Sequence, residues 1–210
     1  DARNNLWRAV AYACHPDAWG VQIVFDNQVI LGTRARKTRT KSFNAFSSID
    51  YPETAMFRDR RLIQFLQRPA EYTHAVFSTA LDPNVFVLRL VQGMRADIIP
   101  MLEGRYRALV LESFGVGGLP GGDDGAMFAA VRDWCGAGHL AVFTTQVPHE
   151  GSDLAVYEVG RAAKALPGVL EAHDMTPEAT AVKLMWVLGQ TTDRAEAEKL
   201  FLTPVQWDIL

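Results

Sequence analysis

The stretch RALVLESFGVGGLPGGDDGAMFAAVRDW, residues 107–134, decides the fold class of this chain. An apolar run stops at a glycine-rich patch, and a pattern with helical spacing follows it. A strand, a glycine loop and a helix in this order are typical of a parallel sheet covered by helices. Ligands of such sheets bind beside the loops that follow the carboxyl ends of the strands. We therefore expect an α/β fold with a ligand-type crevice at this patch.

The glycine patch does not fit the known nucleotide motifs. Read from Gly115, it places Pro120 where a dinucleotide fingerprint needs its third small residue, and it lacks the lysine of a Walker loop. Asp123 and Asp124 would repel phosphate, and we expect them to cap the following helix. What remains is a flexible loop with free N–H groups. Such groups suit either a carboxylate or amide ligand or a neighbouring backbone.

Strand and helix patterns alternate through the second half of the chain. Apolar, β-branched runs predict strands at 85–91, 108–114 and 140–147, and helical periodicity predicts helices at 123–138, 154–166 and 176–190. The last helix has Thr176 as its N-cap and Pro177 at its first position. Its expected apolar stripe consists of Val182, Leu184, Met185, Val187 and Leu188. This alternation predicts layers of parallel sheet with helices on both faces.

The first part of the chain has a different rhythm. Residues 1–14 predict a helix, and VQIVF and QVILG predict two strands around a tight turn at Asp26-Asn27. The basic run RARKTRTK, residues 34–41, predicts an edge strand that its charge keeps soluble. Around residues 50–80 the patterns weaken, which indicates a connection between two structural units.

Composition excludes several classes of function. The net charge of −3 and the absence of an interleaved aromatic platform argue against nucleic acid, and no apolar run approaches the length of a membrane helix. No signal peptide opens the chain, so we expect a cytoplasmic protein with both cysteines as buried thiols. The five histidines lack metal-site spacing, and no G-x-S-x-G elbow occurs. We expect neither metal nor cofactor.

Three stretches carry a more specific signal. ALVLESFGVGGLP (108–120), VFTTQVPHEGSDLAVYEVG (142–160) and HDMTPEATAVKLMWVLGQ (173–190) resemble the C-terminal domain of the bacterial-type L-asparaginases, the asparaginase/glutaminase family. The earlier segments DARNNLWRAV, FDNQVILGTRARKT and FNAFSSIDYPE resemble the second half of the N-terminal domain of that family. The resemblance covers essentially the whole chain and is strongest to the cytoplasmic, type I branch.

The resemblance implies a two-domain α/β fold and a division of the chain. Residues 1–57 would end the N-terminal domain, 58–83 would form the linker, and 84–210 would form the C-terminal domain. It also implies hydrolysis of L-asparagine without a cofactor, in a homodimer or homotetramer whose sites are completed by a partner's C-terminal domain. The family's catalytic threonines lie in T-G-G-T and T-D-T motifs, and neither occurs here. We therefore expect an incomplete first domain that lacks the catalytic segment, and the catalytic residues stay unknown.

The same resemblance selects residues for substrate binding: Ser113, Gly115, Gly117, Gly118 and Glu150. Gly118 stands where the family usually has an asparagine, so only backbone could serve there. Glu150 is either a contact to the substrate ammonium or an exposed loop acid. Two other functions stay open: an asparaginase-like subunit of a tRNA-dependent amidotransferase, and a non-catalytic small-molecule binding module.

Overall fold

The computed structural model describes residues 1–70, 77–120 and 124–210, and they form two compact units, Asp1–Ser78 and Thr79–Leu210. The expected cap residue Asp123 lies outside the described residues. None of the helices in the described ranges has the length and apolar content needed to cross a membrane.

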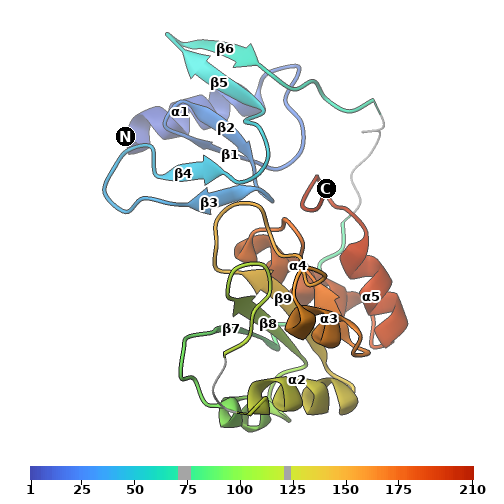
Figure 1. Cartoon of the computed structure of the whole chain (residues 1–210). Coiled ribbons are helices and arrows are strands. Elements are labelled where there is room, and N and C mark those ends of the chain that lie inside the picture. Colours follow the sequence, from blue (N-terminus) through green and yellow to red (C-terminus); the bar gives the residue numbers. More distant parts are fainter. Residues whose placement is uncertain (71–76, 121–123) are drawn as a thin grey trace. The chain divides into compact units, whose positions relative to one another are not determined.

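The first unit is an antiparallel sheet with one helix beside it (Figure 1). The sheet order is β1-β2-β5-β6, and a separate ribbon pairs β3 with β4. Tyr12 of the helix is buried in one cluster with Val29, Ala55 and Phe57 of the sheet. The elements are α1 (Ala2–Ala13), β1 (Gln22–Phe25), β2 (Gln28–Leu31), β3 (Ala35–Lys37), β4 (Phe46–Ser48), β5 (Ala55–Arg58) and β6 (Arg61–Gln64).

Two hairpins shape this sheet, and only one follows from the sequence pattern. The β1–β2 hairpin is confirmed, with Asp26 in the left-handed region at φ 54°. The second hairpin, β5–β6, includes residues that were expected to belong to a connection. Its turn residues Asp59 and Arg60 both have positive φ, 48° and 63°. A turn of this kind usually contains glycine or asparagine, so a turn with arginine at its second position was not recognised from the sequence.

The basic run differs from expectation at its first residue. Arg34 precedes β3 and is fully buried, and its guanidinium carbon lies 5.7 Å from the centre of the Tyr51 ring. Burial raises the pKa of Tyr51, against the opposing effect of the Arg34 charge. Arg34 is therefore part of the interior of the first unit and not of its surface charge.

The second unit contains the expected parallel sheet, in the order β10-β9-β8-β7. Its strands are β7 (Val85–Arg89), β8 (Ala108–Ser113), β9 (Leu140–Thr145) and β10 (Val169–Glu171). Successive side chains of a strand point to opposite faces. Ala108 and Val110 of β8 accordingly join one core cluster, and Leu109 and Leu111 join another.

Helices cover both faces of this sheet, as predicted (Figure 1). The face of Leu109 and Leu111 is covered by α2 (Ala126–Gly136), α3 (Glu158–Lys164) and two short 3₁₀ helices, Ala96–Ile98 and Pro100–Leu102. The face of Ala108 and Val110 is covered by α4 (Pro177–Gln190) and α5 (Arg194–Leu202).

The two longest helices of this unit differ in how well their ends were predicted. The Thr176 hydroxyl caps α4 by accepting from the Ala179 N–H at 3.1 Å, as expected, although Val182 of the expected stripe is 61% exposed. The N-cap of α2 is Gly125, at φ 81°, and it follows Asp124, which is itself left-handed at φ 51°. Asp124 thus precedes the cap position, and the expected aspartate cap is wrong for that residue.

A buried ion pair holds the C-terminal tail onto α4. The Lys183 ammonium lies 2.8 Å from Asp208 Oδ2 and donates to the Thr203 carbonyl at 2.8 Å. The other oxygen of Asp208 accepts from the Val205 N–H at 2.7 Å. Both charged side chains are almost fully buried, 5% and 3% exposed. Each charge in the pair therefore has its partners inside the protein.

Replacing Lys183 tests this pair. Lys183→Met leaves the Asp208 carboxylate buried without its cation, so we expect the free energy of unfolding to fall by about 3–5 kcal/mol. Lys183→Met with Asp208→Asn should recover more than half of that loss, and Lys199→Met, which removes an exposed lysine, should cost under ~0.5 kcal/mol. Denaturant unfolding measures all three. A Lys183→Met protein within ~1 kcal/mol of the parent would contradict the assignment.

The two thiols should differ in reactivity. Cys14 is exposed, contrary to expectation, whereas Cys135 is buried, and burial raises its pKa to about 11. Since the thiolate is the reactive form, Cys135 stays protonated and inert at pH 8. Titration of the native protein with a disulfide reagent should therefore detect Cys14 and not Cys135, and the Cys14→Ser variant should lose this signal. Rapid labelling of Cys135 before denaturation would refute the expectation.

Candidate functional site

Three loops meet at the carboxyl edge of the parallel sheet. They are residues 114–120 after β8, 146–157 after β9 and 172–176 after β10. Because parallel strands end at the same edge, their following loops lie together there. Four of the residues selected from the sequence lie at or in the first loop, and Glu150 lies in the second.

The glycine loop closes on itself. The N–H groups of Gly117 and Gly118 both donate to the Phe114 carbonyl, at 3.0 and 2.7 Å, and the Phe114 N–H donates to the Gly118 carbonyl at 3.0 Å. These two N–H groups were expected to be free for a ligand, and that expectation is wrong for them. Gly115 and Gly117 have positive φ, 49° and 145°, which explains why this tight closure uses glycine.

Hydroxyl groups tie the base of this loop to β9. Ser113 is fully buried, and its hydroxyl donates to the Thr144 carbonyl at 2.6 Å. The Thr145 hydroxyl donates to the Gly115 carbonyl at 2.5 Å and accepts from the Val147 N–H at 3.0 Å. In this arrangement the proton of Ser113 is directed at backbone. The residue fixes the glycine loop in place.

The loop after β9 packs directly on the glycine loop. The Asp153 N–H donates to the Val116 carbonyl at 2.8 Å. A Cβ at Gly117 would lie 2.4 Å from Cδ2 of Leu154, a side chain that is 1% exposed. Leu154 therefore occupies the space that a side chain at position 117 would need. Glu150 lies on the outer part of this loop, exposed and at φ 76°.

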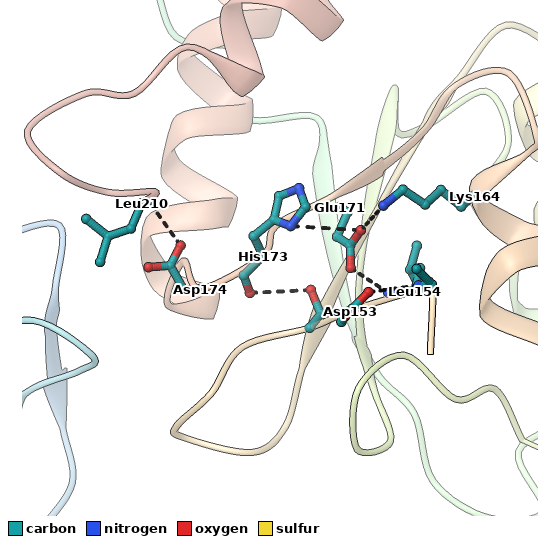
Figure 2. Close-up of polar contacts among 9 residues, drawn as sticks. Asp153, Leu154, Lys164, Glu171, His173, Asp174 and Leu210 are labelled. Carbon is teal, nitrogen blue, oxygen red and sulfur yellow. Dashed lines mark hydrogen bonds and ion pairs between the residues drawn. The ribbon is translucent and has the colours of Figure 1, made fainter. Parts of the chain in front are cut away.

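A buried carboxylate at the end of β10 connects these elements. Glu171 is 4% exposed, and its Oε1 accepts from the Leu154 N–H at 2.6 Å (Figure 2). Its Oε2 lies 2.8 Å from the Lys164 ammonium and 3.9 Å from Nδ1 of His173. The hydrogen bond from Lys164 to Glu171 raises the pKa of that ammonium. Sequence reasoning missed Glu171, although an acid at the end of the buried segment VLEA was a signal for a special role.

The loop after β10 completes the edge. The His173 carbonyl accepts from the Ser152 N–H at 2.8 Å. Oδ1 of Asp174 accepts from the Leu210 N–H at 3.1 Å (Figure 2). A Cβ at Gly151 would lie 2.4 Å from the His173 carbonyl oxygen. The loops after β9 and β10 therefore touch backbone to backbone at Gly151.

The three loops 114–120, 146–157 and 172–176, which we call the rim, carry exposed acidic and polar side chains. Glu150 and Asp153 are exposed carboxylates on the same loop, and the His173 side chain is 44% exposed. Acidic groups of this kind suit an ammonium or amide ligand. Within 1–70, 77–120 and 124–210, no three His, Cys, Asp or Glu side chains gather closely enough to hold a metal ion.

Two family profiles match the chain. The Glutaminase/Asparaginase C-terminal domain matches residues 84–201, and the N-terminal asparaginase domain matches residues 1–71. The L-asparaginase of Thermococcus kodakarensis is 37% identical over 201 residues, which are 95% of this chain and 60% of that protein. A glutamyl-tRNA(Gln) amidotransferase subunit of Metallosphaera sedula is 32% identical over 178 residues, covering 82% of this chain and 39% of that one.

A solved structure agrees with these sequence matches. The thermostable L-asparaginase from Thermococcus kodakarensis superposes with a TM-score of 0.91 at 34% identity, over 100% of this chain and 63% of that one. The chain thus spans less than two thirds of each of these relatives.

The contact at Gly151 should be intolerant of any side chain. Gly151→Ala sets a methyl group against the backbone of His173 and Asp174 in a left-handed conformation, so we expect a loss of about 3–4 kcal/mol. Gly115→Ala is the matched control, because its φ is also positive but nothing lies within 4 Å. It should cost only about 1–2 kcal/mol. Equal losses for the two variants in denaturant unfolding would show that the loops do not touch there.

Proposed function

The chain belongs to the glutaminase/asparaginase family, and from this membership we propose that the whole protein hydrolyses L-asparagine to L-aspartate and ammonia. The observation that carries the proposal is the 37% identity to the Thermococcus L-asparaginase over 95% of this chain. Because the chain spans 60% of that relative, the activity is proposed for the protein as a whole.

Within that reaction the proposal assigns this chain the rim of the site. Hydrolysis of an amide needs an activated hydroxyl and donors for the oxyanion. The family's T-G-G-T and G-T-D-T motifs do not occur in these 210 residues, so no residue here is assigned as the nucleophile. The loops at the carboxyl edge of the sheet instead supply contacts to the substrate, with neither metal nor cofactor.

The residues selected from the sequence have three different roles: lining the rim with backbone, positioning the loop, and contacting the substrate with a side chain. Backbone of Gly115, Gly117 and Gly118 lines the rim, and Ser113 holds the base of the loop through its bond to Thr144. The exposed carboxylate of Glu150 contacts the substrate ammonium. We further propose that the rim completes the site of a second copy of the chain in a homodimer or homotetramer, located in the cytoplasm.

A second candidate function is favoured by the other relatives. Glutamyl-tRNA(Gln) amidotransferase subunits of Metallosphaera sedula and Pyrococcus furiosus are 32% and 33% identical to this chain. A protein of this kind would work with a partner subunit and a charged tRNA. The chain spans only 39% of each of these relatives, against 60% of the asparaginase, which is why asparaginase is the first choice.

Ammonia release tests the proposal. The whole protein should release ammonia from L-asparagine at a rate that does not change when glutamyl-tRNA and other subunits are added. Release that requires charged tRNA would favour the amidotransferase. Calorimetric binding of asparagine with no release would favour a non-catalytic binding module.

The role of Glu150 can be tested in the same assay. Glu150→Gln removes a charge that faces the substrate ammonium, so we expect KM for asparagine to rise about tenfold, as for the loss of one charge-assisted hydrogen bond. Glu103→Gln removes an exposed acid elsewhere in the second unit and should leave KM unchanged. Equal KM values for the two variants would exclude Glu150 from the substrate contact.

A further inference from the structure

We propose that Glu171 and Lys164 form a positioning pair, which holds the loop after β9 against the glycine loop and thereby sets the geometry of the substrate rim. The inference rests on the proposed asparaginase function for its kinetic consequence. Neither side chain is assigned a contact with substrate, so both act through the backbone that they hold.

The position of Glu171 needs an explanation beyond packing. A carboxylate that is 4% exposed has lost nearly all of its water, and such a charge is stable only when protein groups replace that water. The Leu154 N–H serves one oxygen and the Lys164 ammonium serves the other. The Lys164 side chain is 49% exposed, so only the acid bears the full cost of burial. The structure thus places one buried charge where it can fix one backbone amide.

That amide belongs to Leu154, which contacts several segments of the rim. The N–H of Leu154 is held by Glu171, and its side chain fills the space above Gly117. The two preceding residues bond to the other loops, Asp153 to Val116 and Ser152 to His173. Three consecutive N–H groups, 152 to 154, therefore join three separate segments of the edge. Movement of Leu154 would shift the segment that carries Glu150 and Asp153.

Helix α3 contacts Leu154 directly through Gly160, and it contacts Glu171 through Lys164. A Cβ at Gly160 would lie 2.5 Å from the Leu154 carbonyl oxygen, so the helix backbone packs directly on that residue. Lys164 stands one turn further along, on the same face of the helix, and reaches Glu171 at 2.8 Å. Glu171 and α3 therefore clamp Leu154 from two directions, and the ion pair links the two halves of the clamp.

Hydrogen exchange tests the clamp in the whole protein without reference to activity. Glu171→Ala removes the acceptor of the Leu154 N–H, and we expect amides 152–154 to exchange at least about tenfold faster, while α5 is unchanged. Glu171→Gln keeps an acceptor of the same shape and should restore most of the protection. Glu198→Ala removes a partner of a half-buried ion pair on α5, away from the clamp, and is the matched control. Unchanged exchange at 152–154 in Glu171→Ala would overturn the proposal.

The kinetic arm separates positioning from a purely structural role. For Glu171→Ala, assayed well below its melting temperature, we expect kcat/KM for asparagine to fall about tenfold or more through KM, with kcat changed by less than about twofold. Lys164→Met removes only the cation and should give a smaller rise in KM, and this milder variant serves if Glu171→Ala does not fold. A lower melting temperature with an unchanged KM in both variants would refute a positioning role.

The two proposals fail in different ways. If the parent protein releases no ammonia from asparagine, the proposed function is wrong, and the exchange experiment still decides whether the clamp exists. If the parent is active and amides 152–154 exchange equally in all variants, the clamp is wrong and the function stands.

Discussion

All of β9 and nearly all of β8 are buried, so both faces of the central strands must be covered by protein. Helices α2 and α3 cover one face, and α4 and α5 cover the other. The strands pair in parallel, and each connection between them returns through helical segments to the end of the sheet where the strands begin. The carboxyl ends of the strands therefore lie together at the opposite end, with the three loops of the rim.

Buried charges determine the conformation of loops that apolar packing alone does not determine. Apolar contacts are non-directional, so a packed sheet alone does not set the conformation of its loops. Glu171 and Asp208 each combine a lysine with a backbone N–H, and each holds an irregular segment to a regular one. Leaving either acid unpaired would be costly, so the segments have one favourable arrangement. The same tail that Asp208 fixes also bonds to Asp174 beside the rim.

The sequence predicts the parts of this fold that depend on local pattern. The α4 helix follows from its period and its Thr176 cap, and the parallel sheet follows from alternating strands and helices. Features that depend on residues distant in the sequence were missed. They are the burial of Arg34, the exposure of Val182 and the contacts of the buried Glu171 with Leu154 and Lys164. At the site, the position of the glycine loop follows from its strand. The strand does not predict the hydrogen bonds that close this loop on itself, nor the packing of Leu154 above Gly117.

The packing of Leu154 also restricts how relatives of this protein can diverge. Its side chain fills the space beside Gly117, and its backbone lies against Gly160, so neither glycine can accept a larger residue alone. At position 117 a smaller residue at 154 would remove the clash but not the strain of the positive φ, and at position 160 the obstacle is the Leu154 backbone itself. Substitution at either glycine therefore carries a cost that no single change at position 154 removes, whereas Glu150 is exposed on the outer part of its loop. Among relatives, the interlocked base of these loops should persist while their outer part varies.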